Sequence, residues 1–271
     1  AYSEHLSRRN GSVDLERRQS STRDAFFAEI AGRTSSVASA ADQATFAAAQ
    51  VPGQLGNEHD ERTLWAVCAA NINLAEALGV DLAIAHQGVA NATDPVERAY
   101  QVILVEENYH TRLLRLAIGA MGLTMQVHRP TWWIRAVVGT FTRLPRPVSD
   151  FMTFCSELNG IAAFRLLHER AQTLFANEPD VLRSINDVFS EILIDEIGHV
   201  HFLRARLSPL LLRVAGWVSG PLMEIYLCGV PEMKRLFGRP ALHAALAKVI
   251  SGESLKMPGG GVHPALVATA A

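Results

Sequence analysis

Two short segments of the sequence each place a glutamate three residues before a histidine. Glu107 and His110 form the first pair, and Glu196 and His199 form the second. Residues three apart lie on the same face of a helix, so each glutamate would point in the same direction as its histidine. Apolar residues at helical spacing surround both pairs, and an unpartnered ionisable group is costly in such surroundings. Mixed carboxylate and imidazole groups suit iron or manganese, so the pairs predict a metal site.

One further glutamate precedes each pair at a similar distance. Glu76 lies 31 residues before Glu107, and Glu157 lies 39 residues before Glu196. A helix, a turn and most of a returning helix occupy about this length. The two glutamates fall on the apolar faces of the expected helices, which makes them candidates for additional ligands. Two other acids remain open as alternatives, Asp81 in place of Glu76 and Glu169 in place of Glu157.

The elements that would position these residues are helices. Apolar residues recur with helical spacing along most of the chain, and no stretch of any length alternates as a strand would. Asp94 followed by Pro95 is a helix start, because an N-cap carboxylate accepts backbone hydrogen bonds and proline suits the first helical position. The sequence therefore predicts an all-α fold. Long helices are expected at about 58–86, 94–122, 148–175 and 178–207, a crossover with a short helix at 128–147, and further helices within 22–50, at 209–228 and at 231–250.

The distribution of apolar residues also predicts the domain organisation. Residues 1–21 are polar and rich in arginine, which predicts a flexible N-terminal arm and not a signal peptide. A single helical domain is expected over 22–250, with the metal-binding helices at about 58–206. The glycine-rich segment 251–271 predicts a loose C-terminal tail.

Composition excludes several classes of partner. Half of the chain is apolar (49%), the charged fraction is 19% and the formal net charge is −2, so neither nucleic acid nor an anionic membrane is an expected partner. Three scattered cysteines form no CxxC pair, which suits a reducing cytoplasm. The apolar stretch Leu207–Val230 contains two charged residues and two prolines. We interpret it as a helix that covers the domain or forms a dimer contact, and not as a membrane span.

The order Glu, Glu-x-x-His, Glu, Glu-x-x-His resembles the ferritin-like di-iron carboxylate superfamily over about 58–206. The resemblance implies a four-helix bundle that has additional N-terminal and C-terminal helices in this chain. It implies that Glu107 and Glu196 bridge two metals and act in catalysis. It further implies that Glu76 and Glu157 are terminal ligands and that His110 and His199 each bind one metal.

Two acids stand directly before the glutamates of the pairs, Glu106 and Asp195. In oxygenases of the resembled superfamily, an acid at this position often holds the ligand histidine of the opposite helix. A metal-bound histidine commonly donates its other ring N–H to a carboxylate. We therefore expect Asp195 to pair with His110, and Glu106 to pair with His199.

The resemblance also implies an activity. Residues that several subfamilies of this superfamily require are absent from the sequence, which reduces the number of candidate activities. The chain has no CxxC for a rubrerythrin-like second iron site, no tyrosine at Leu114 for a ribonucleotide reductase radical, and no histidine at Ile192 as in arylamine N-oxygenases. The expectation is an oxygenase or oxidase with two iron ions (or manganese), dioxygen as co-substrate and an external electron donor such as a reductase or ferredoxin. Hydroxylation, N-oxygenation, desaturation and oxidative C–C cleavage stay open. The alternatives are a ferroxidase or iron-storage protein and a metal-free helical scaffold.

An apolar or aromatic small molecule is the expected substrate, bound by a monomer or homodimer. Small and apolar residues of the third and fourth long helices would line its pocket. The candidates are Phe154, Cys155, Gly160, Phe164, Phe189, Leu193 and Phe202.

Overall fold

The computed structural model describes residues 2–14, 16–33, 42–50, 59–87, 93–126, 132–141 and 143–256. These residues are mostly helical, and the only strands among them pair as a short antiparallel hairpin, so the predicted all-α class is confirmed. The elements are α1 (Tyr2–Asn10), β1 (Val13–Asp14), β2 (Gln19–Ser20), α2 (Asp24–Ala31), α3 (Gln43–Ala49), α4 (Glu61–Gln87), α5 (Pro95–Gly119), α6 (Trp132–Phe141), α7 (Arg146–Leu174), α8 (Pro179–Arg204), α9 (Pro209–Gly229), α10 (Pro231–Phe237), α11 (Arg239–Ile250) and the 3-10 helix η1 (Glu253–Leu255).

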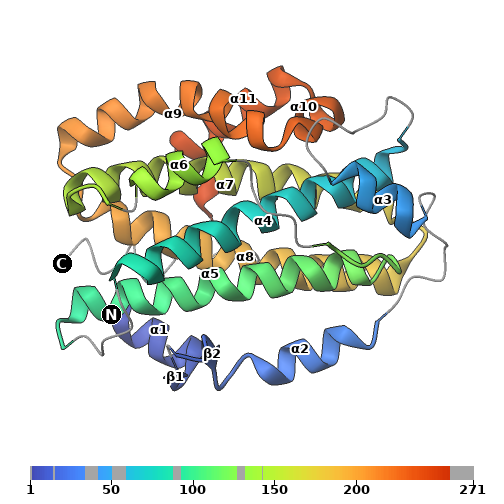
Figure 1. The fold of residues 1–271 in the computed structure, drawn as a ribbon, viewed down its shortest axis with the longest axis horizontal. Helices are drawn as coiled ribbons and strands as arrows, with labels where there is room; N and C mark the ends of the chain where they lie inside the picture. Colours follow the sequence, from blue (N-terminus) through green and yellow to red (C-terminus); the bar gives the residue numbers. More distant parts are fainter. Residues whose placement is uncertain are drawn as a thin grey trace.

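Four long helices form the centre of the molecule (Figure 1). Helix α4 packs along α5 and α7 packs along α8, and the two pairs meet where α5 contacts α8 and α4 contacts α7. These helices agree with the four long helices predicted from the sequence to within a few residues at each end. The predicted crossover contains α6. Every predicted metal ligand lies inside one of the four helices, and those of α8 lie in its C-terminal half.

Local sequence explains where some helices begin and end. The Asp94 carboxylate accepts hydrogen bonds from the backbone N–H groups of Val96 and Glu97 at 2.9 and 3.0 Å, which confirms the predicted N-cap of α5. The helix predicted at 231–250 is divided into α10 and α11. Gly238 lies between them with φ of 75°, a conformation in which a side chain is strained, so the chain turns there.

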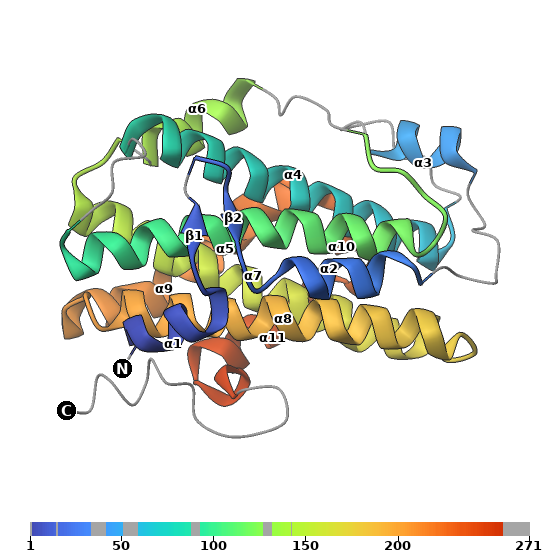
Figure 2. The same ribbon diagram turned by 90° about the horizontal axis from the view of Figure 1, so that it is seen from below.

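Other segments cover the four long helices on two sides. Figure 2 shows α1, the β1–β2 hairpin and α2 lying across α5 and α8. On the opposite side, α9 and α11 pack on α7, and α10 packs on α4 (Figure 1). An aromatic cluster ties the long helices together at one end. Trp65 of α4 contacts Phe175 and Phe189, and its indole N–H donates a 2.9 Å hydrogen bond to the Leu167 carbonyl of α7.

The N-terminal segment differs from the flexible arm that the sequence predicts over 1–21. Residues 2–10 form a helix in which Leu6 and Asn10 are buried. The physical reason is that polar side chains of this segment reach buried carboxylates of the long helices, a contact without hydrophobic periodicity. At the other end, η1 follows α11 directly, and the predicted loose tail from 257 on lies outside the described residues.

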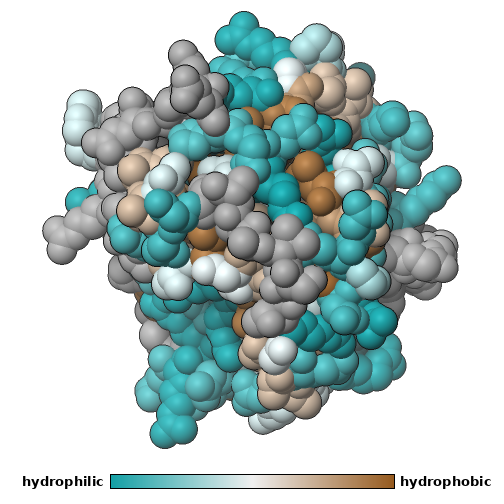
Figure 3. Space-filling view, turned by 90° about the vertical axis from the view of Figure 1, so that its right-hand side faces the viewer, coloured by the Kyte–Doolittle hydropathy of each residue, from teal (hydrophilic) through white to brown (hydrophobic). Residues whose placement is uncertain are grey.

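Two helices are long and apolar enough to cross a membrane by length and composition alone, Glu61–Ile84 within α4 and Pro209–Gly229. The first is one of the four packed helices. The second packs one face onto α7, as predicted for Leu207–Val230, while Leu210, Trp217 and Ile225 are exposed on its other side. The end of the molecule in Figure 3 is mostly hydrophilic, with small separate apolar areas. A cytoplasmic location without membrane contact stays a prediction.

Candidate metal centre

The structure brings all six predicted ligands together between the four long helices. They form two overlapping groups, within each of which the candidate ligand atoms lie within 4.8 Å of one another. Glu107 of α5 and Glu196 of α8 belong to both groups, as bridging ligands would. The first group adds Glu76 and His110, and the second adds Glu157 and His199. The site can therefore hold two cations that share two carboxylates.

The structure also separates the six residues from the alternatives left open by the sequence. Asp81 lies at the surface, where its carboxylate pairs with Arg18 at 2.7 Å and its side chain is 63% exposed. Glu169 is exposed. Helical phase explains both outcomes, because Asp81 and Glu169 each lie on the solvent-exposed face of their helix. Glu76 and Glu157 are therefore the candidates on α4 and α7.

Several polar atoms in the cluster are buried without a hydrogen bond, although two of them, Glu107 Oε1 and His199 Nδ1, lie 3.0 Å apart and would pair if the imidazole were protonated. They belong to the carboxylates and to the Nδ1 atoms of both histidines, and they are Glu76 Oε2, Glu107 Oε1, Glu196 Oε2, His110 Nδ1 and His199 Nδ1. Buried polar groups in folded proteins nearly always have a partner, because leaving one unpaired costs about 1–3 kcal/mol. These atoms are hard oxygen and imidazole nitrogen donors that converge on one place. The donor set therefore fits divalent iron or manganese.

In each of the two imidazole rings, one nitrogen faces the cluster and the other faces a carboxylate outside it. Nδ1 of His110 lies 3.1 Å from Glu196, and Nδ1 of His199 lies 3.0 Å from Glu107, so both Nδ1 atoms face the cluster. Nε2 of His110 lies 3.3 Å from Asp195, and Nε2 of His199 lies 3.0 Å from Glu106. Both outer pairs expected from the sequence are present. A proton on Nε2 would donate to the outer carboxylate and leave the Nδ1 lone pair free for a metal.

The outer carboxylates are themselves held by the N-terminal segment. The Arg23 guanidinium donates to both oxygens of Asp195 at 2.9 and 3.0 Å, and Arg9 binds the same carboxylate. The Asn10 side chain donates a 2.7 Å hydrogen bond to Glu106. These contacts fix the orientation of each carboxylate and thereby of each imidazole. A chain of hydrogen bonds thus runs from the N-terminal segment to the metal-facing atoms.

Sequence reasoning missed Arg9, Asn10 and Arg23. They lie in or beside a polar, arginine-rich stretch that has no hydrophobic periodicity, which is the usual composition of a flexible arm. The only available signal was the surplus of cations at one end of the chain, together with two acids beside the ligand glutamates. Asp195, the partner of Arg9 and Arg23, is 186 residues away from Arg9, and Glu106, the partner of Asn10, is 96 residues away from it, so local patterns carry no trace of these contacts.

Burial and mutual contact shift the ionisation of the cluster. Burial raises the pKa of Glu76 and Glu157 well above the ordinary value, which favours their protonated forms in the metal-free protein. Burial opposes charge on Glu107 too, but the neighbouring imidazoles outweigh it and lower the Glu107 pKa to about 2. Burial likewise opposes the His199 cation, yet Glu106 and Glu107 raise its pKa to about 10. In the metal-free protein, bound protons therefore offset part of the negative charge of the carboxylates. Metal cations would offset the same charge when bound.

The residues expected to line a substrate pocket are mostly core residues in the structure. Of the candidates, Phe154 lines a cavity among α7, α8, α9 and α11. Phe164 and Phe189 contact each other edge to face, and Phe189 also stacks on His168. An apolar helix face indicates burial without separating core from pocket wall, so the substrate pocket stays a prediction. The others that do not line the cavity are Cys155, Gly160, Leu193 and Phe202.

The contact between Arg9 and Asp195 leads to a first prediction. Arg9→Met should weaken divalent-metal binding roughly tenfold, the lower end of the range for losing an outer partner of a ligand histidine, because Asp195 then holds His110 less firmly. A competitive chelator titration with cobalt(II) measures the affinity.

Arg33→Met is a matched control for Arg9→Met. Arg33 also joins the N-terminal segment to α8, through a 2.9 Å ion pair with Asp187, but it does not touch the cluster. This variant should lower the melting temperature and leave the metal affinity unchanged. Equal losses of affinity in the two variants would show that Arg9 acts only by docking the segment.

A second prediction concerns pH. The pKa of His199 is raised from 6.5 to about 10, so its contribution to the stability of the metal-free protein is complete below pH 6.5 and is lost as pH rises through 10. The melting temperature of chelator-treated protein should fall over this range. Metal affinity should rise with pH over the same range, because binding must displace the proton from Nδ1. A melting temperature of the chelator-treated protein that stays constant from pH 6.5 to 10 would contradict the assignment.

Comparison with known proteins does not assign the chain to a family. No family model, curated protein or solved structure matches the chain. The paired ligand groups and the donors that hold them are therefore the basis for assigning a function.

Proposed function

We propose that this chain is a ferritin-like, four-helix carboxylate protein that holds two iron ions and uses dioxygen to oxidise a small apolar or aromatic organic molecule. The proposal includes an external electron donor such as a reductase or ferredoxin, and a cytoplasmic monomer or homodimer. Hydroxylation and N-oxygenation are the leading reaction types.

One observation carries the proposal, namely the two overlapping ligand groups that share Glu107 and Glu196. A solvated cluster of acids would not leave five oxygen and nitrogen atoms buried and without hydrogen bonds. Structural zinc sites are usually closed tetrahedra of cysteine and histidine, whereas this donor set is dominated by carboxylates. Two cations that share carboxylates are the arrangement that uses every one of these donors.

The residues divide into roles by position. Glu107 and Glu196, which belong to both ligand groups, would help to hold both irons, while Glu76 with His110 would complete one site and Glu157 with His199 the other. When bound, reduced iron would supply electrons and open coordination positions for dioxygen. Manganese has similar ligand preferences and is the alternative metal.

The surrounding protein would control protons and water. Asp195 and Glu106 would keep each imidazole in the tautomer whose Nδ1 is unprotonated, and Arg23 would keep Asp195 ionised through its paired hydrogen bonds. His110 and His199 are fully buried, and apolar side chains of the four helices surround them. Exclusion of bulk water at this depth strengthens every charge interaction in the site.

Iron loading tests the proposal directly. Anaerobic reconstitution with iron(II) should give close to two irons per chain by elemental analysis, and Glu107→Ala should retain less than one, because Glu107 belongs to both ligand groups. Arg33→Met again serves as a control that should load like the unmodified protein. Fewer than one iron or manganese per chain, with Glu107→Ala behaving like the unmodified protein, would rule out the di-metal site.

Assembly size then separates an oxygenase from an iron-storage protein. Size-exclusion chromatography with light scattering should give a monomer or a dimer, because small-substrate oxidation needs access to each site and no shell. A very large, closed assembly that accumulates many irons per chain would favour a ferroxidase or iron store in its place.

A further inference from the structure

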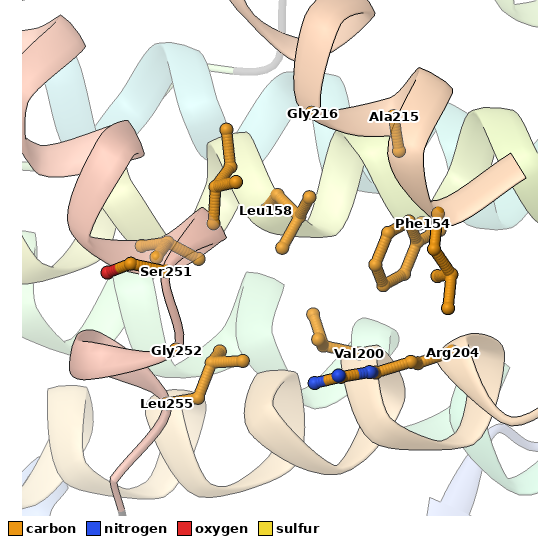
Figure 4. A pocket seen from close by; sticks show the side chains of 12 residues that line it. Phe154, Leu158, Val200, Arg204, Ala215, Gly216, Ser251, Gly252 and Leu255 are labelled. Atoms are coloured by element: carbon orange, nitrogen blue, oxygen red, sulfur yellow. The ribbon is translucent and has the colours of Figure 1, made fainter. Parts of the chain in front are cut away.

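One cavity lies on the side of the long helices that the C-terminal helices cover. It has a volume of about 170 Å³, is lined by α7, α8, α9, α11 and η1, and is open to solvent at the exposed Arg204 and Ser251 (Figure 4). Phe154 and Leu158 of α7 and Val200 of α8 form part of its wall, and Ala215 and Gly216 of α9 lie above them. Among the described residues that line it, Ser251 and Arg204 have polar side chains and the others are apolar or glycine. Such a cavity accepts an apolar body and can direct only one or two polar contacts to it.

The cavity shares helix turns with the metal centre. Phe154 lies one turn before Glu157 on α7, and Val200 lies one turn after Glu196 on α8. One helical turn is about 5.4 Å along the axis, so the cavity wall and the two carboxylates use neighbouring turns of the same two helices. This shared position on α7 and α8 is the basis for linking a molecule bound here to the proposed oxidation.

Among the described residues, Arg204 is the only one with a charged side chain that lines the cavity. In Figure 4 it reaches from α8 toward the centre of the cavity. Its guanidinium makes no hydrogen bond or ion pair with the described part of the chain. Arg206, two residues later, differs in that it pairs with Asp150 at 3.0 Å. Arg204 thus offers a planar set of donors to a ligand.

The other polar group of the lining is already engaged. The Ser251 hydroxyl donates a 3.0 Å hydrogen bond to the Lys248 carbonyl, which closes the end of α11. A neutral polar ligand would therefore find no free hydroxyl donor here. A carboxylate matches the guanidinium with two parallel hydrogen bonds, which is the geometry that arginine favours.

The volume sets the size of the apolar body. An apolar cavity of about 150 Å³ is enough to bind benzene, so about 170 Å³ fits a single ring or a short alkyl chain. We propose that this cavity binds a small monocarboxylate with one aromatic ring, its ring between α7, α8 and α9 and its carboxylate on Arg204. Its role as the substrate of oxidation rests on the proposed function, whereas its binding does not.

Binding can be tested on the chelator-treated 271-residue chain with benzoate as the probe. Isothermal titration calorimetry should show benzoate binding, with benzyl alcohol at least about tenfold weaker because it cannot pair with the guanidinium. Arg204→Met should remove this preference and leave benzyl alcohol binding unchanged. Arg213→Met on α9, whose side chain does not line the cavity, is the matched control and should behave like the unmodified protein.

A second pair of variants tests the cavity by filling it. Gly216 lines the cavity, and a Cβ added there would make an ordinary contact of 3.9 Å with Ile250 Cγ2, so Gly216→Val adds volume at the cavity wall and should abolish binding of both probes. Gly220→Val is its control on the same helix, because no atom lies within 4 Å of the added Cβ. No benzoate binding by the unmodified protein, or equal binding by Gly216→Val, would overturn the proposal, as would undiminished benzoate affinity in Arg204→Met.

The two proposals fail separately. Benzoate binding is measured without metal, so a chain that binds benzoate but does not load iron would keep the carboxylate site and lose the di-iron function. A chain that loads two irons per protein but binds no benzoate would keep the metal centre and lose this inference.

Discussion

The structure depends on the confinement of four carboxylates and two imidazoles between four apolar helices. Glu76, Glu107, Glu157 and Glu196 cannot all be ionised at such short range without opposite charge nearby. In the metal-free protein, protons supply part of that charge, as the raised pKa values of Glu76, Glu157 and His199 show. Two divalent cations would supply it without protons. The helices can therefore pack closely only if the cluster is neutralised.

The carboxylates around the six candidate ligands also need opposite charge nearby. Asp195 and Glu106 add two more buried carboxylates, and Arg9 and Arg23 lie against them. A buried ion pair gives little net stability, but removing one partner leaves an uncompensated charge and is costly. The N-terminal segment is therefore fixed in place by the charges that it neutralises. Its contacts determine which way the histidine rings turn.

The N-terminal segment and the C-terminal helices cover opposite sides of the four long helices and make different kinds of contact with them. The N-terminal segment covers α5 and α8 and contributes polar donors to the outer carboxylates (Figure 2). The C-terminal helices cover α7 and α4 with apolar side chains and leave a cavity with a single cation (Figure 4). One side is thus suited to holding the ligands, and the other is suited to receiving a molecule. The metal centre lies between them.

Local sequence was sufficient for the long helices and for the four ligands of the two Glu-x-x-His pairs, and it proposed Glu76 and Glu157 beside one alternative each. Helical periodicity fixes which residues share a face, and the spacing of Glu107 with His110 and of Glu196 with His199 needs nothing beyond one helix. The outer pairs followed from the resemblance, because an acid beside each ligand glutamate faces the neighbouring helix. The division of the last predicted helix at Gly238 depended on one backbone angle, which the pattern of apolar residues does not encode.

Tertiary structure alone decided the rest. The choice of Glu76 over Asp81 required knowing which face of α4 packs against α5. The roles of Arg9, Asn10 and Arg23 depend on contacts between residues far apart in the sequence. The cavity was unpredictable for a related reason. Phe164, Phe189 and Phe154 look alike in the sequence, and only the packing of α9 and α11 leaves space beside Phe154. Periodicity encodes the face a residue occupies, whereas packing between distant helices decides what that face meets.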